Sequence, residues 1–141
     1  MVLQSLLSSF DVTPISCEFD FSSVLTSVSA MTPVARVVEM TGVAAYMGAT
    51  QIIEDPAVLV AAASIMTVEA RHQTILNVMQ GAKAIPQAFD MALTPPEVLA
   101  IAGAFIKGPC DLGITRTCAT VIDRVKFLMR PWHFFFPFRR N

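Results

Sequence analysis

The chain has 141 residues, enough for one domain with its own core, and it is unusually apolar, with 54% hydrophobic and 15% charged residues. A net charge of −1 argues against a nucleic-acid-binding protein, because such a protein needs a basic surface. The longest uncharged runs are shorter than the roughly 20 residues of a membrane span.

The N-terminal sequence MVLQSLLSSF lacks the basic region and cleavage pattern of a signal peptide, so the cellular compartment stays open. The three cysteines, Cys17, Cys110 and Cys118, are not spaced like a zinc site. One disulfide between Cys17 and Cys110 is an alternative that spacing alone does not decide.

Residues 2–10 place leucines on one side and serines elsewhere, which indicates the end of a helix. Residues 11–21 are expected to form a loop, and residues 22–31 either a short helix or an irregular lead-in. A long helix then runs from Pro33 to about Ile53, with Thr32 as N-cap and Pro33 in its first position.

This first long helix is apolar nearly all round, which is typical of a helix that is buried on most sides. Its small residues would let a neighbouring helix approach closely: Gly42, Ala45, Gly48 and Ala49. Glu39 is the one acid in its interior, and it shares a face with Tyr46.

A second long helix is predicted over 58–79, with Asp55 as N-cap and Pro56 in the first position. Its stripe at steps of three and four is expected to face the core: Val58, Ala62, Ile65, Glu69, His72, Leu76 and Met79. The opposite stripe is polar: Ser64, Thr67, Arg71, Thr74 and Asn77. Glu69 and His72 are therefore predicted to lie in the middle of the buried face.

The short connection makes the two long helices antiparallel neighbours. Glu39 lies about as far before the turn as Glu69 lies after it, so a rise of about 1.5 Å per residue puts them at the same height. Glu39, Glu69 and His72 are the ligand types that di-metal carboxylate bundles place on core-facing helices. The sequence therefore predicts a shared metal site at this level.

A plainer interpretation stays open, in which Glu69 and His72 form a polar pair, with Arg36 or Arg71 as partners. Likewise, Tyr46 is either an ordinary core tyrosine or a residue that supports the site.

Further along the chain, 81–91 is expected to be a loop. Thr94-Pro95-Pro96-Glu97 is a capping box that opens a short helix to about Ile106, and Gly108-Pro109 ends it. From 116 onward the sequence changes character. Residues 121–129 have helical potential, and the aromatic and basic end, RPWHFFFPFRRN, is expected to be irregular.

These segments together resemble the fungal ferritin-like domain family, which is related to desiccation-related and stress-response proteins. The similarity rests on CEFDF (17–21), EMTGVAAYMGA (39–49), AAASIMTVEARH (61–72), PQAFDMALTPPEV (86–98) and AFIKGPC (104–110). It implies an all-α, partial ferritin-like helix bundle over 1–115, with two long antiparallel helices and shorter ones, followed by a divergent tail over 116–141. Members are usually secreted.

The resemblance implies that Glu39 is the third-helix glutamate ligand, and that Glu69 and His72 are the fourth-helix pair. The first two helices of the family, with the other ligands, have no counterpart here, so only a half-site for iron or manganese is expected. A homodimer would complete the bundle. The alternatives are a metal-free structural or stress protein and a degenerate fragment without activity. No nucleophile–base pair or nucleotide motif indicates an enzyme.

Overall fold

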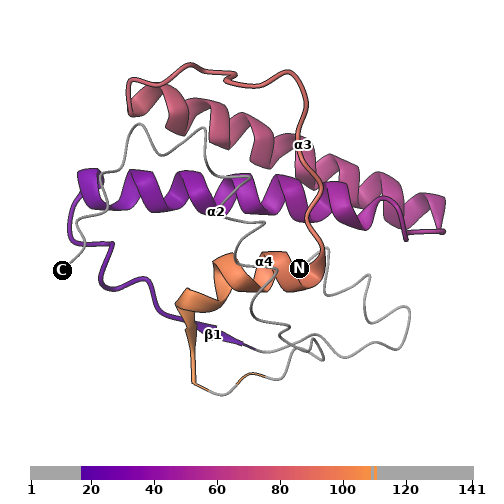
Figure 1. The fold of residues 1–141 in the computed structure, drawn as a ribbon, viewed down its shortest axis with the longest axis horizontal. Coiled ribbons are helices and arrows are strands. Elements are labelled where there is room, and N and C mark those ends of the chain that lie inside the picture. The colour runs from indigo at the N-terminus through magenta and orange to yellow at the C-terminus, as the bar shows by residue number, and fades with distance from the viewer. Residues whose placement is uncertain (1–16, 109, 111–141) are drawn as a thin grey trace.

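The computed structural model describes residues 17–108 and Cys110. Two long helices, a short one and a two-stranded ladder make up this part of the chain (Figure 1). In chain order they are β1 (Glu18–Phe19), α2 (Val28–Ala49), α3 (Pro56–Met79), α4 (Pro95–Ala102), a 3₁₀ turn (Gly103–Phe105) and β2 (Ile106–Lys107). The predicted all-α class is confirmed. The helix expected over 2–10 and the irregular tail lie outside the described residues.

Helix α2 begins earlier than predicted, because Ser27 and not Thr32 is its N-cap. The Ser27 hydroxyl accepts a hydrogen bond from the backbone N–H of Ala30 at 3.1 Å. Pro33 therefore lies inside the helix, where it leaves the carbonyl of Ser29 without its usual partner. The helix tolerates this loss because the residues before Pro33 also pack, as the 6% exposure of Thr32 shows. It ends at Ala49, short of the expected Ile53.

Helix α3 starts as predicted, with Pro56 in its first turn. Asp55 Oδ1 accepts hydrogen bonds from the backbone N–H groups of Ala57 at 2.7 Å and Val58 at 3.1 Å. The short turn before it returns the chain, and α3 lies along α2 as the predicted antiparallel neighbour (Figure 1).

The buried face of α3 differs from the predicted one. Its buried residues are Ala62, Gln73 and Asn77, whereas His72 and Met79 are exposed. The physical reason is helical drift: three turns of about 3.6 residues lead from Ala62 to Gln73 and not to His72. Asn77, expected on the polar outer stripe, is only 1% exposed.

Helix α2 lies between α3 and α4 and supplies half of the small apolar core (Figure 1). The buried hydrophobic residues are Met40, Val43, Ala44, Ala62, Leu93 and Leu99. Between Ala30 and Thr50 every residue except Val38 is at least partly buried, so the prediction from its all-round apolar sequence is confirmed.

The segment between α3 and α4 is held from both sides. Asn77 Nδ2 donates to the carbonyl of Ala84 at 3.0 Å, and the backbone N–H of Leu93 donates to the carbonyl of Ala44 at 2.9 Å. Helix α4 then opens with the predicted capping box of Thr94 and Glu97.

Helix α4 ends at Ala102, so the expectation of a helix to about Ile106 is wrong. The 3₁₀ turn follows, and Ile106 pairs with Phe19 in an antiparallel ladder that also contradicts the predicted loop over 11–21. A disulfide joins Cys17 to Cys110 at one end of this ladder, beyond the pair that Glu18 forms with Lys107.

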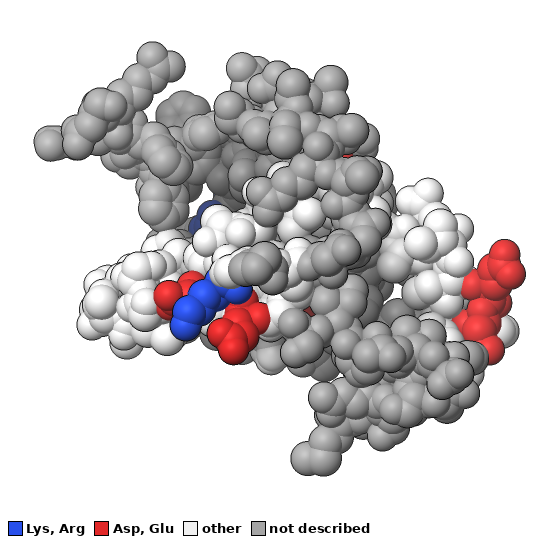
Figure 2. Space-filling view, turned by 90° about the horizontal axis from the view of Figure 1, so that it is seen from below, with Lys and Arg blue, Asp and Glu red and all other residues white. Residues whose placement is uncertain are grey.

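No helix within the described residues is long and apolar enough to span a membrane. On the face drawn in Figure 2 the described surface is mostly uncharged, in keeping with the low charge content.

Candidate functional site

Two of the three predicted ligand residues contact each other across the two long helices. Glu39 comes from the middle of α2 and His72 from the C-terminal half of α3, and His72 Nδ1 lies 3.2 Å from Glu39 Oε1. The predicted equal height of the two helices at this level is therefore confirmed. The contact favours a proton on Nδ1, which leaves Nε2 as the ring nitrogen that can bind another group.

Glu69 points from α3 towards α2, into the space that Gly42 leaves free. A methyl group in place of the Gly42 hydrogen would collide with the Glu69 carboxylate. The sequence showed Gly42 only as a small residue, and its particular role in making room for this carboxylate was missed. No spacing rule would have shown it, since it depends on how the two helices are rotated.

Burial raises the pKa of the Glu69 carboxyl above its ordinary value, and the negative charge of Glu39 raises it further. His72 has the opposite, smaller effect on the pKa of Glu69. Tyr46, one turn beyond Gly42, has its pKa raised by burial and by the charge of Glu69. Two carboxyl groups, an imidazole and a phenol thus share one electrostatic environment.

Two features differ from the predicted site. The His72 side chain is 54% exposed, whereas the Glu39 side chain is 25% exposed, so the imidazole lies at the outer edge of the helix pair and not on its buried face. In addition, no three His, Cys, Asp or Glu side chains among residues 17–108 and Cys110 are arranged to hold a metal ion. Glu39 and His72 instead contact each other directly.

Of the cationic partners that the sequence left open, Arg36 is 5% exposed and its Nη1 donates to Gln80 Oε1 at 3.4 Å. Gln80 Nε2 in turn donates to the carbonyl of Thr32 at 2.9 Å. Arg36 therefore helps tie the C-terminal end of α3 to the first turns of α2. Arg71 lies on the exposed side of α3.

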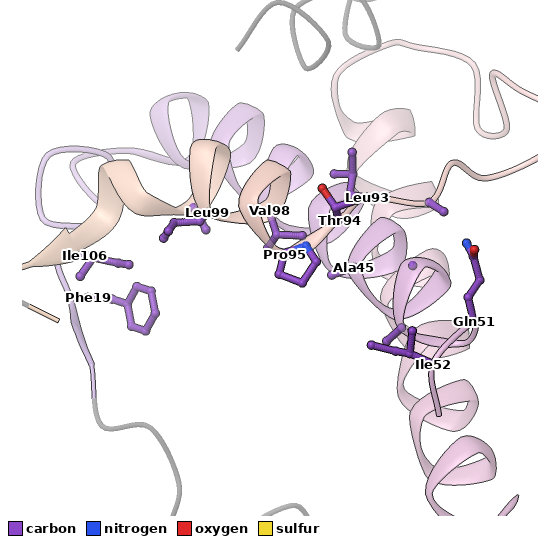
Figure 3. Close-up of a pocket in the computed structure, with 14 residues that line it drawn as sticks. Phe19, Ala45, Gln51, Ile52, Leu93, Thr94, Pro95, Val98, Leu99 and Ile106 are labelled. Carbon is purple, nitrogen blue, oxygen red and sulfur yellow. The ribbon is translucent and has the colours of Figure 1, made fainter. Parts of the chain in front are cut away.

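An apolar groove of about 680 Å³ lies apart from this cluster, between the end of α2, the start of α4 and the β ladder (Figure 3). Phe19, Ile52, Val98 and Leu99 are among its lining residues, and Gln51 and Thr94 are its polar ones. No titratable side chain is among the described residues that line the groove.

A family model of the ferritin-like domain matches residues 1–82, which is more than half of the chain. The chain belongs to the ferritin-like domain family. No curated protein matches the chain.

The match contains Glu39, Glu69 and His72, and it ends in the turn that follows α3. In this ferritin-like chain, α4 and β2 therefore lie beyond the matched range, although α4 supplies Leu99 to the core and the disulfide ties the ladder together. The two long helices are the elements that the family match and the candidate site have in common.

Proposed function

We propose that this ferritin-like protein binds iron or manganese through Glu39, Glu69 and His72. The observation that carries the proposal is the 3.2 Å contact between His72 Nδ1 and Glu39 Oε1, with Glu69 one turn before His72 on α3 and facing Gly42 of α2. Carboxylate and imidazole are donors that suit both metals. Burial and, after it, the negative charge of Glu39 raise the pKa of Glu69, and a bound cation would offset both effects.

The residues fit such a group in chemistry, and each would have a distinct task. Glu69 would move its carboxylate within the space beside Gly42. Glu39 orients the His72 ring through Nδ1 and so presents Nε2. A bound iron or manganese ion would supply oxidation by dioxygen or peroxide, the chemistry of carboxylate-bridged metals in helix bundles. We assign the stress-related role of the fungal, desiccation-related branch on the strength of the sequence similarity over 61–72.

A second candidate is a metal-free protein that keeps the scaffold and has no metal chemistry. The direct contact between Glu39 and His72 favours it, because each group already satisfies the other. The lack of a metal-binding group of three among the described residues points the same way.

Metal content of the purified protein, followed by Mn²⁺ titration of the EDTA-treated protein, tests the two candidates. We expect roughly one ion per chain, lost in the Glu69→Ala/His72→Ala double variant and kept in Glu54→Ala, whose side chain is exposed and remote in sequence. Gly42→Ala provides a finer test, because the added methyl group displaces the Glu69 carboxylate without removing a donor. Equal metal content in all variants would show that the metal binds elsewhere on the chain, and no metal in any variant would leave the metal-free scaffold as the function.

A further inference from the structure

Helix α3 carries an apolar stripe along one flank of the face that packs on α2. Six residues occur at alternating steps of four and three, and we call them the outer seam: Ala61, Ile65, Val68, His72, Ile75 and Met79. This spacing has the 3.5-residue average of a coiled-coil seam. His72 is its one polar member.

The outer seam is open to solvent along much of its length. Val68 is 38% exposed, Ile75 58% and Met79 57%, and the side chain of His72 is 54% exposed. The seam lies beside the face that packs on α2, since Ala62 and Gln73 are buried there. Figure 1 shows α3 on the opposite side of α2 from α4. A row of exposed Val, Ile and Met on a regular helix has the chemistry of a helix-binding surface.

We propose that the outer seam is an interface between two copies of this chain, which pack α3 against α3 about a two-fold axis. A seam with a 3.5-residue repeat packs best against another seam of the same repeat, and a two-fold axis makes one surface serve both partners.

The position of His72 favours a second copy over an unrelated partner. His72 lies close to the middle of the seam, so a parallel and an antiparallel arrangement both bring the two imidazoles to nearly the same level. Because each Nδ1–H is given to Glu39, Nε2 of each imidazole is an acceptor, and one water molecule that donates to both Nε2 atoms can bridge the two copies. A single polar residue in a coiled-coil seam is also a known means of fixing register.

The size of the outer seam indicates how strongly two copies should bind. From Ala61 to Met79 it runs about 27 Å, so two helices in contact bury roughly 500 Å² per copy, close to the lower limit of a specific interface. We therefore expect a weak dimer. The arrangement brings two Glu39–His72 pairs together and so joins the two candidate metal sites, but the contact itself needs no metal.

Sedimentation equilibrium of the full chain in EDTA, from about 1 to 300 μM, tests the interface in the range expected for its size. Ile75→Lys should weaken dimerisation about 100-fold, because each dimer loses two buried isoleucines and gains two charges. Val68→Lys should act in the same direction. Ile85→Lys is the matched control, since Ile85 is 76% exposed and lies outside the seam.

Helix content and melting temperature of each variant are measured in parallel, to show that the monomer remains folded. A wild-type chain that stays monomeric up to the highest concentration would overturn the proposal. A dimer that survives Ile75→Lys would do so as well, because its interface would lie elsewhere. If the chain is a monomer and Ile75→Lys lowers its melting temperature, another part of the same chain covers the seam, and the proposal is overturned. Because EDTA is present throughout, a failure of metal binding leaves this test unaffected.

Discussion

Two glycines of α2 offer a matched pair of substitutions that separates fold from site. Gly42 faces the Glu69 carboxylate, and Gly48 faces the backbone of Leu93. The change to alanine is the same in both cases, and both glycines are helical, so each variant gains about 1 kcal/mol of helix propensity. What differs is whether the neighbour can move.

For Gly48→Ala the neighbour is a backbone carbonyl, which the added methyl group would strike. The segment is also fixed, since the N–H of Leu93 donates to the carbonyl of Ala44 and the Leu93 side chain is 3% exposed. Overpacking costs about 1–3 kcal/mol, and the strained hydrogen bond about 0.5–1.5 kcal/mol more. After the gain in propensity we expect a net loss of about 1–3 kcal/mol.

For Gly42→Ala the neighbour is the end of a flexible side chain, which rotates away at little cost. We expect unchanged or slightly higher stability, together with the loss of metal affinity proposed above. Urea unfolding of the EDTA-treated variants measures the first effect. A loss of 1 kcal/mol corresponds to roughly 4–8 °C in melting temperature for a domain of this size. Equal stabilities of the two variants would refute the reasoning, because the close approach at Gly48 would then not constrain the fold.

Three further predictions concern single residues. The pKa of Glu69 is raised in the folded state, so the stability tied to this carboxyl is present below its ordinary value of 4.5 and is lost as the pH rises through the folded value. Glu69→Gln, which stays neutral, should therefore raise the melting temperature of the EDTA-treated protein at pH 7 and flatten its fall above pH 4.5, and a lower value at pH 7 would contradict this. Asn77→Ala removes the hydrogen bond to the carbonyl of Ala84 at a site that is 1% exposed, and we expect a loss of about 1–3 kcal/mol in urea unfolding, with faster amide exchange in 80–93. Lys83→Ala, at an exposed position of the same segment, serves as its control and should change little. Pro33→Ala restores a helical hydrogen bond to the carbonyl of Ser29 and should stabilise the protein by roughly 1–2 kcal/mol in the same assay, and a lower stability would contradict this.

Local signals predicted much of the fold. Asp55-Pro56 and Thr94-Pro95 mark helix starts by side-chain chemistry that acts within one turn, and the structure places both as expected. Thr32-Pro33 carries the same signal, but the helix start that it predicted is wrong. Ser27 is the N-cap five residues earlier, and the helix tolerates the one hydrogen bond that Pro33 removes. Which of two valid caps is used depends on packing that a local motif does not contain.

In the candidate site, too, some features could be predicted from local sequence signals and others depend on packing. Counting residues on either side of the turn predicted that Glu39 and His72 lie at the same height along the helix pair, and their contact confirms this. Which face of α3 turns towards α2 was predicted wrongly. A stripe drawn in steps of three and four differs from the true helical period by almost one residue at His72. The β ladder was missed as well, since two residues on each strand carry no period of their own.

The bond between Cys17 and Cys110 has a topological consequence. It spans a sequence separation of 93 residues, so everything from β1 to β2 belongs to one covalent ring. Closing a loop of this length removes disorder from the unfolded chain worth about 4–5 kcal/mol in the chain-entropy model, a large share of the stability of a domain with so small a core. A protease that cuts once between α3 and α4 opens the ring but leaves its two arms joined. The nicked protein therefore migrates as one species until a reductant is added, and only then separates into two.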